Sequence, residues 1–147
     1  MFTGRYEFSI DDKGRTSIPV RFREQLAESS GDRLIVTTDT YPCLLAYPEP
    51  EWRTFQQKMQ ELDEFDEDVI ALKRYFLGSA VECPIDRQGR ILLTQALREH
   101  AGIRGEVVWV GQIEKIEIWA KEKWNELFPS LQEQAKAARR ALARRGK

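Results

Sequence analysis

"IDDKGRTSIP", at residues 10–19, returns in altered form as "IDRQGRILLT" at residues 85–94. Both copies carry the pattern Ile-Asp-x-x-Gly-Arg, and they lie 75 residues apart. A glycine inside a short charged run is typical of a tight turn, because glycine adopts a positive φ at little cost. The sequence therefore predicts two copies of one strand–turn–strand motif.

The repetition continues after this motif. Three further blocks match in the same order: Arg23-Glu24 with Arg98-Glu99, "GDRLIVT" from Gly31 with "GEVVWVG" from Gly105, and "LLAYPEPEW" ending at Trp52 with "IEIWAKEKW" ending at Trp124. Matching blocks in a fixed order indicate an internal repeat, which has to be recognised before any single motif is weighed. The chain therefore contains two copies of one unit.

Each unit is expected to form about four short strands, with one short helix between the first and second pairs and a longer helix at its end. Alternation of apolar and polar residues and the positions of proline and glycine predict strands at 6–10, 16–18, 33–38, 43–47, 81–85, 90–94, 106–111 and 115–120. Helices are predicted at 20–29, 51–76 and 95–102 and from Lys121 onward.

Some residues carry finer expectations for these helices. In the first helix, Val20, Phe22 and Leu26 are expected to be the buried positions. Pro129 is expected to break or restart the last helix, because proline lacks the backbone N–H that a helix interior needs. We divide the chain into a first repeat at 5–50, a connecting helical segment at 51–78, a second repeat at 79–122, and a helix with a basic tail at 123–147.

A single unit is too small to bury a core alone, so the two units are expected to pack against each other. The predicted fold is therefore α+β and β-rich, with two tandem units forming a pseudo-two-fold barrel surrounded by peripheral helices. Such an arrangement presents the same turn twice on one side. This geometry suits an extended, repeating ligand such as duplex DNA.

Composition narrows the function classes. The net charge of −1 means that any nucleic-acid binding must come from local patches. No segment approaches the roughly 18 apolar residues of a membrane span, and Cys43 and Cys83 are too far apart for a C-x-x-C zinc or redox site. We expect free thiols in a cytoplasmic protein, with no membrane partner.

The sequence offers little support for an enzyme. His100 is the lone histidine, and it has no recognisable nucleophile or ligand cluster beside it. There is no phosphate-binding glycine loop and no triad spacing. We therefore expect no catalytic residues, no cofactor, no metal and no small-molecule substrate.

Two charge runs stand out. The acidic run "ELDEFDED" at residues 61–68 is interpreted as a solvated helix face. The tail "QAKAARRALARRGK" at residues 134–147 carries six cations and no acid, and either a basic helix or a frayed terminus would fit it. The four tryptophans are expected in the core or in subunit contacts.

Three stretches together resemble the MraZ family: "MFTGRYEFSIDDKGRTSIPVRFRE" at residues 1–24, "IDRQGRILLTQALREHAGI" at residues 85–103, and "VWVGQIEKIEIWAKEKW" at residues 108–124. That family is a tandem, fused form of the SpoVT-AbrB swapped-hairpin domain. The resemblance covers the chain from Met1 to about Trp124, and the paired turns at this spacing are its most specific feature.

The resemblance implies a bacterial sequence-specific DNA-binding transcriptional regulator, with repression as the expected direction. It implies binding to short direct repeats in double-stranded DNA near the promoter of the division and cell-wall gene cluster. It also implies a homo-oligomeric ring located on the nucleoid. Two alternatives stay open: an antidote-like module that binds a toxin protein, and a ring-forming scaffold whose basic turns are incidental.

Arg15 has two competing interpretations. Its guanidinium could contact a guanine edge in the major groove, where a bidentate contact is worth about 1–3 kcal/mol of discrimination. It could instead pair only with Asp11, and an exposed pair contributes about 0–1 kcal/mol. The resemblance favours the DNA contact, because the DNA-binding surface of the family includes this turn.

The other candidate DNA contacts are cations on or near the two turns. They are Lys13, Arg5, Arg21, Arg23, Arg90 and Arg87. Lys13 is matched by Gln88 in the second copy, with Arg87 one position away, so the first turn is expected to be the main reader. Asp11, Gly14, Asp86 and Gly89 are expected to shape the turns rather than to bind.

Overall fold

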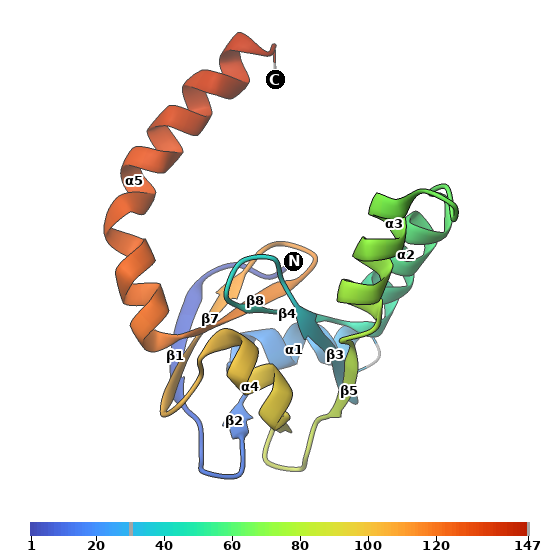
Figure 1. Ribbon diagram of the computed structural model, residues 1–147. Helices are drawn as coiled ribbons and strands as arrows, with labels where there is room; N and C mark the ends of the chain where they lie inside the picture. The colour runs from blue at the N-terminus through green and yellow to red at the C-terminus, as the bar shows by residue number, and fades with distance from the viewer. Residues whose placement is uncertain (30, 147) are drawn as a thin grey trace.

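The computed structural model describes residues 1–29 and 31–146. These residues form an α+β fold with eight strands in two sheets (Figure 1), as predicted. The strands are β1 (Arg5–Ser9), β2 (Arg15–Ser17), β3 (Arg33–Thr38), β4 (Leu44–Tyr47), β5 (Val81–Pro84), β6 (Arg90–Leu92), β7 (Glu106–Gly111) and β8 (Ile116–Ala120). The helices are α1 (Val20–Glu28), α2 (Glu49–Gln60), α3 (Glu67–Leu72), the π-helical turn η1 (Lys73–Leu77), α4 (Gln95–Ala101) and α5 (Lys121–Arg144).

The six-stranded sheet has the order β1-β7-β8-β4-β3-β5. Read inward from either edge, this order passes through equivalent strands of the two units: β1 and β5, then β7 and β3, then β8 and β4. Each edge strand pairs with a strand of the other unit, antiparallel in both cases. The two units therefore exchange strands and complete one another's sheet.

The sheet register corrects one block of the repeat. Phe8 pairs with Val107, and its equivalent Cys83 pairs with Leu34, so Leu34 and Val107 occupy equivalent positions. The sequence alignment of Gly31 with Gly105 would instead align Leu34 with Val108, one residue further along the chain. That step matters because a one-residue slip moves a side chain to the other face of a sheet.

β2 and β6 form a separate two-stranded antiparallel sheet, which we call the ribbon. Its two strands also come from different units. Among the described residues, no ladder joins the ribbon to the six-stranded sheet. The edge strands of the six-stranded sheet are β1 and β5. The predicted pseudo-two-fold arrangement is present, but within residues 1–29 and 31–146 no strand ladder closes it into a barrel.

The main core lies between the inner face of the large sheet, the ribbon, and helices α1 and α4. Leu34, Val36, Val107 and Trp109 point inward from the sheet and are essentially inaccessible to solvent. Phe22 of α1 packs edge-on against the ring of Phe2, with the ring centroids 5.4 Å apart. Both units contribute to this single core.

The outer face of the sheet is covered separately on each side. Trp124 of α5 packs on Val108, Val110 and Trp119, whereas Trp52 of α2 packs on β3 and β4. Strands β3 and β7 are therefore buried on both faces, which explains their continuous apolar runs. All four tryptophans are buried.

Helix boundaries differ from prediction in the connecting segment. The helix expected at 51–76 is divided into α2, α3 and η1 by a turn at the acidic run. The Asp63 carboxylate accepts a hydrogen bond from the Phe65 amide, and Asp66 caps α3 by accepting from the Asp68 amide. Aspartates satisfy backbone amides well at turns and helix starts, and here that local bonding ends the helix.

Two further expectations about helices were wrong. Val20 is 55% exposed, because it occupies the first position of α1 and only Phe22 and Leu26 reach the core. α5 continues through Pro129 as one curved helix (Figure 1), since a proline in a helix can be accommodated by bending. The basic tail is helical to Arg144; Lys147 lies outside the described residues.

Cys43 and Cys83 are buried free thiols, as predicted. Burial raises the pKa of the Cys83 thiol to about 11 and raises that of Cys43 as well. None of the described helices is both long enough and apolar enough to cross a lipid bilayer. The domain boundaries proposed from the sequence stay a prediction.

Candidate nucleic-acid interface

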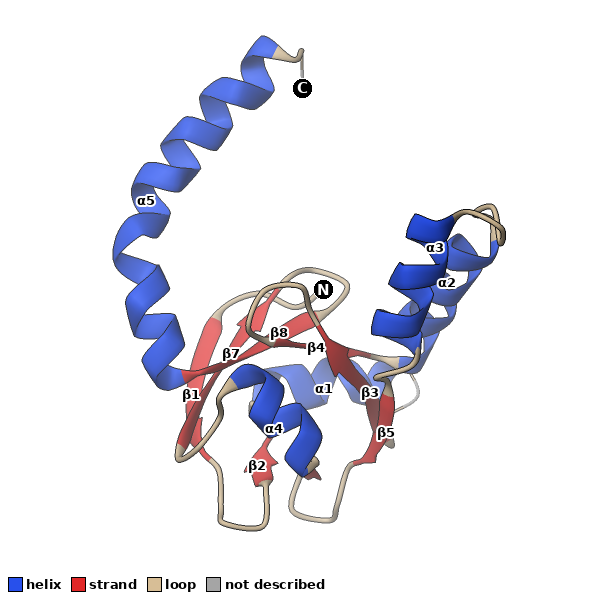
Figure 2. Cartoon of the chain, viewed as in Figure 1, coloured by secondary structure: helices blue, strands red, loops and turns tan. Residues whose placement is uncertain are grey.

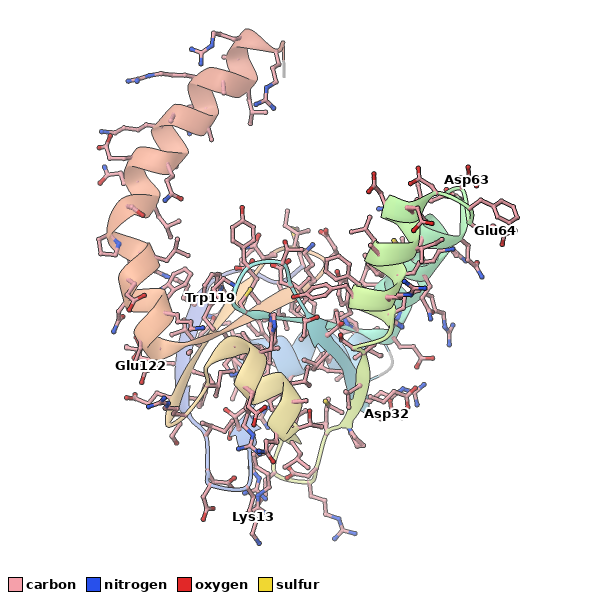
Figure 3. The ribbon with its side chains drawn as sticks, viewed as in Figure 1. Lys13, Asp32, Asp63, Glu64, Trp119 and Glu122 are labelled. Atoms are coloured by element: carbon pink, nitrogen blue, oxygen red, sulfur yellow. The ribbon has the colours of Figure 1, made fainter. Side chains whose placement is uncertain are left out.

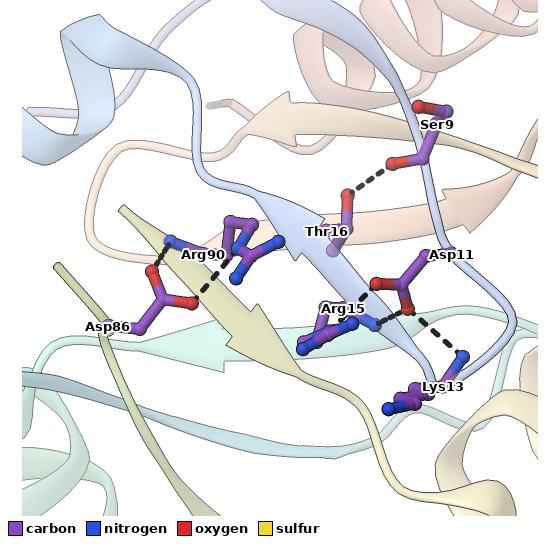
Figure 4. Close-up of polar contacts among 7 residues, drawn as sticks. All are labelled: Ser9, Asp11, Lys13, Arg15, Thr16, Asp86 and Arg90. Atoms are coloured by element: carbon purple, nitrogen blue, oxygen red, sulfur yellow. Dashed lines mark hydrogen bonds and ion pairs between the residues drawn. The ribbon is translucent and has the colours of Figure 1, made fainter. Parts of the chain in front are cut away.

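The two repeated turns lie side by side at one end of the molecule, below the ribbon (Figures 1 and 2). We call residues 11–14 and 86–89 the paired turns. In the first, one Asp11 carboxylate oxygen accepts hydrogen bonds from the amides of Lys13 (3.0 Å) and Arg15 (2.8 Å). The other oxygen accepts from Nε of Arg15 at 2.7 Å (Figure 4).

The second turn repeats this network atom for atom. Asp86 accepts from the amides of Gln88 and Arg90, each at 2.9 Å, and from Nε of Arg90 at 3.0 Å (Figure 4). The bonds that the Arg15 amide and side chain donate lower the pKa of the Asp11 carboxyl to about 2. Those from Arg90 lower the pKa of Asp86. Each carboxylate thus binds two backbone amides of its own turn region.

Each turn is also held by the other unit. The carbonyl of Gly14 accepts from the amide of Leu93 at 2.8 Å, and the carbonyl of Gly89 accepts from the amide of Ile18 at 2.9 Å. Behind these bonds, Arg98 Nε donates to the Leu93 carbonyl at 3.0 Å. Arg23 Nε donates likewise to the Ile18 carbonyl, at 3.1 Å. The two turns are therefore interlocked.

The interlock explains why both turns need glycine. Gly14 has φ +96° and Gly89 has φ +77°, in the region that side chains rarely adopt. A Cβ at Gly14 would lie 2.5 Å from the Leu93 carbonyl oxygen and 2.8 Å from Arg98 Nε. A Cβ at Gly89 would overlap the Arg23 side chain. Glycine is required for the backbone conformation and for the close approach of the other unit.

The ribbon register places both turn arginines on one face. Arg15 lies opposite Leu92 and Ser17 lies opposite Arg90, whereas Thr16 and Ile91 form the pair between them. Residues alternate between the two faces of a strand. Thr16 and Ile91 are buried, so Arg15, Ser17, Arg90 and Leu92 make up what we call the outward face. Arg15 and Arg90 are diagonal neighbours, roughly 7–8 Å apart at the backbone.

The guanidinium of Arg15 is held by Asp11 through only one of its three nitrogens. Its Nε binds Asp11, and among the described residues no hydrogen bond or ion pair engages its two terminal nitrogens. The same holds for Arg90 and Asp86. Pairing with the aspartate and contacting a ligand are therefore compatible, because the carboxylate fixes the plane of the guanidinium and leaves its outer edge available.

The other predicted contacts divide into two groups. Lys13 and Arg87 are exposed at the tips of the paired turns, and the Lys13 side chain points away from the body (Figure 3). Arg21 is exposed in the first turn of α1. Arg23 is half-buried, and its Nε is engaged in the interlock, so its binding role stays a prediction beside a clear structural one.

Arg5 does not join this group. It lies at the start of β1, the end remote from the turn, where its guanidinium carbon sits 4.1 Å from the ring centroid of Phe128 and 5.6 Å from that of Trp124. A cation over an aromatic face is an attractive contact. The structure therefore uses Arg5 to hold α5 against the sheet.

Sequence reasoning missed two residues of this end. Arg98 belongs to the interlock, and its alignment with Arg23 was a signal that it shares the same role. Leu92 is 50% exposed on the outward face although the apolar run "ILL" suggests burial. Its exposure follows from the alternation along β6, which the sequence alone did not orient.

One group could in principle hold a metal. Ligand atoms of Asp39, Cys43 and Glu117 all lie within 4.8 Å of one another. The Cys43 Sγ lies 3.5 Å from an Asp39 oxygen. Burial, with Glu117 and Asp39 adding to it, raises the pKa of this thiol, and a thiol must lose its proton to bind a metal. The arrangement therefore fits a hydrogen-bonded thiol.

Comparison with known families decides the relationship. A family model described as "MraZ protein, putative antitoxin-like" matches the chain twice, over residues 1–75 and 76–145. The chain belongs to the MraZ family. The resemblance seen in the sequence is confirmed, and the two matches agree with the tandem units of the fold.

Several MraZ relatives bear the name "Transcriptional regulator MraZ". The protein of Caldanaerobacter subterraneus subsp. tengcongensis is 43% identical over 130 residues, which is 88% of each chain. That of Escherichia coli K12 is 42% identical over 127 residues, 86% of this chain and 84% of its own. That of Thioalkalivibrio sulfidiphilus is 43% identical over 124 residues, 84% and 83% of the two chains.

The interlock predicts a strong effect of Gly14→Ala. The new methyl group meets the Leu93 carbonyl and imposes a disfavoured φ, so the free energy of unfolding should fall by at least about 1–3 kcal/mol. Gly105→Ala is the matched control, because nothing lies within 4 Å of a Cβ there. Chemical denaturation measures both; an unchanged Gly14→Ala variant would contradict the interlock.

The Asp11 network predicts a specific pH dependence. The pKa of the folded state is about 2, below the ordinary 3.8, so the stabilisation by Asp11 is complete above about pH 4. It is lost as the pH falls toward 2. NMR titration should report the low pKa, and Asp11→Asn should flatten the acid side of the stability curve. A carboxyl of Asp11 that titrates near 4 would refute this assignment.

Proposed function

We propose that this MraZ protein is a sequence-specific DNA-binding transcriptional regulator that contacts duplex DNA with its ribbon and paired turns. The observation that carries the proposal is the outward face: Arg15 and Arg90 lie there together, each oriented by its own aspartate. The names of the relatives, all transcriptional regulators, point to the same class of function.

The geometry suits the major groove of B-DNA. That groove is about 12 Å wide and admits a two-stranded β-ribbon. The free terminal nitrogens of Arg15 and Arg90 match the paired acceptors O6 and N7 of guanine. Because Asp11 and Asp86 already hold the guanidinium groups, little side-chain entropy is lost when the base contact forms.

The distribution of charge overcomes an unhelpful net charge of −1. Lys13 and Arg87 add cations at the tips of the paired turns. The acidic segment at residues 61–68 lies at the opposite end of the molecule, as the positions of Asp63, Glu64 and Lys13 in Figure 3 indicate. Phosphates approaching the turns are therefore kept away from this acidic segment.

The proposed target is a set of short direct repeats near the promoter of the bacterial division and cell-wall gene cluster, where binding represses transcription. One ribbon offers few base contacts and therefore binds weakly. Several ribbons in register along repeated sites would multiply these weak contacts through linked binding. A protein engaged in this way resides on the nucleoid in the cytoplasm.

Linked binding requires an assembly, and we propose a homo-oligomeric ring. α5 and the α2–α3 pair project from the sheet on the side away from the turns (Figure 2). Residues 61–68 carry six acids and no cation, whereas residues 134–146, at and just beyond the end of α5, carry five cations and no acid. Phe65 is 82% exposed in the first segment and Leu142 is 42% exposed in the second.

Charge complementarity and exposed apolar groups make these two segments a natural pair. We assign the contact to neighbouring copies, with the basic segment of one protomer on the acidic segment of the next. A head-to-tail contact of this kind is heterologous, and it generates a ring when its rotation closes. The turns, at the far end of each protomer, stay free for DNA.

The DNA function is tested with Arg15→Ala. Loss of one bidentate contact costs about 1–3 kcal/mol per ribbon, and because a ring repeats the loss, specific binding should be abolished in a gel shift with the upstream DNA of its own operon. Arg53→Ala, an exposed arginine on α2, is the control and should bind normally. Undiminished affinity of Arg15→Ala, with fold and assembly intact, would sink the proposal.

The same gel shift separates the alternatives. A scaffold or an antitoxin-like module with incidental DNA contact should show no sequence preference between operon and scrambled DNA. A regulator that contacts phosphates as well as bases should prefer its operator and lose affinity steeply as salt rises.

The assembly is tested by charge reversal. Arg139→Glu with Arg140→Glu should lower the mass measured by analytical ultracentrifugation, because the basic segment then repels its acidic partner. Adding Glu64→Arg and Glu67→Arg to the same chain should restore the mass, since the pair is reversed as a whole. A mass that the first two changes leave untouched, or that the second two fail to restore, counts against this contact.

A further inference from the structure

Leu92 is an exposed apolar residue among the polar residues of the outward face. It lies directly opposite Arg15 in the ribbon, with Arg90 two residues before it on the same strand. Half of its side chain is exposed, while its neighbours Ile91 and Leu93 are 1% and 0% exposed. A single exposed leucine is ordinary on most protein surfaces. Here it stands among the polar groups that the proposed function directs at DNA.

The major groove offers an apolar partner for such a side chain. Each base pair displays hydrogen-bonding groups there, and the exception is the C5-methyl group of thymine, which proteins contact with apolar side chains. Burying a leucine against that methyl removes apolar surface of both partners from water. No comparable apolar group is available on the phosphates or on a guanine edge.

We infer that Leu92 is a specificity-determining residue that contacts a thymine methyl in the operator. This inference rests on the proposed DNA function and deepens it. Residues directly opposite each other in an antiparallel pair have Cα atoms about 4.5–5.5 Å apart, and successive bases rise about 3.4 Å along a strand. The thymine therefore lies one or two base pairs from the guanine that Arg15 contacts.

The two halves of the ribbon are not equivalent at this position. Ser17 occupies the place in the first unit that Leu92 occupies in the second, and each is opposite an arginine of the other unit. The tips differ as well, with Lys13 in one turn and Gln88 in the other. One protomer consequently reads a site without two-fold symmetry, in one orientation, with the thymine beside Arg15 and not beside Arg90.

Replacing thymine by deoxyuridine tests this contact directly, because only the methyl group is removed and every hydrogen-bonding group stays. The operator is first defined by selecting the tightest sequences from random DNA with the unaltered protein. Each thymine is then replaced singly, and affinities are measured for the unaltered protein and for Leu92→Ala. Leu72→Ala is the control, an exposed leucine on α3 at 39% exposure.

The losses of affinity caused by deoxyuridine and by Leu92→Ala are expected not to add. Deoxyuridine at one thymine, within two base pairs of the guanine on which Arg15→Ala loses discrimination, should weaken binding by the unaltered protein and by Leu72→Ala roughly fourfold per site. Leu92→Ala should bind the thymine operator about as weakly as the unaltered protein binds the deoxyuridine operator. Deoxyuridine at that thymine should not weaken Leu92→Ala further. Leu92→Ser, which installs the residue of the first unit, should behave in the same way.

Two results would overturn the inference. One is an unaltered protein that binds its operator specifically but responds to no deoxyuridine. The other is a Leu92→Ala variant that keeps the full response, or that changes the mass of the assembly instead. Absence of any preferred sequence would instead refute the DNA function itself, so the two failures can be told apart.

Discussion

The backbone hydrogen bonds by which each paired turn is held by the other unit are the constraint on which the rest of the structure depends. Gly14 and Gly89 each offer a carbonyl to the strand end of the other unit, and Arg98 and Arg23 close over them. Because each turn is built by one unit and fixed by the other, both are held in one relative position. The interlock therefore supports the outward face and its two anchored arginines in addition to the pairing of β2 with β6.

Much of this could be read from the repeat. The spacing of Asp11, Gly14 and Arg15 and its echo 75 residues later predicted two turns, their shaping residues and a pseudo-two-fold. What the repeat could not show is which strands pair. Strand exchange between the units is a tertiary choice, and it brings Arg98 against Gly14 and Arg23 against Gly89.

Other features of the structure depend on contacts between distant residues. Arg5 was expected along the edge of the first turn, where a phosphate contact stays a prediction, and its aromatic partner Phe128 comes from the last helix. Leu92 sits in an apolar run, and the ribbon register turns it outward. The acidic run interrupts the predicted helix at 51–76, because Asp63 and Asp66 accept hydrogen bonds from nearby backbone amides. These aspartates were visible in the sequence, but the prediction treated the acidic run as part of one long helix.

Strand exchange also governs how the chain can fold during synthesis. β1 is made first, but its partner β7 ends at Gly111, so most of the chain must leave the ribosome before the first edge is covered. Until then β1 is an unpaired strand, which another nascent chain can capture with its own β7. Contacts of such long sequence separation make folding slow. The exchange that completes the sheet thus makes the folding of the first unit depend on synthesis of the second.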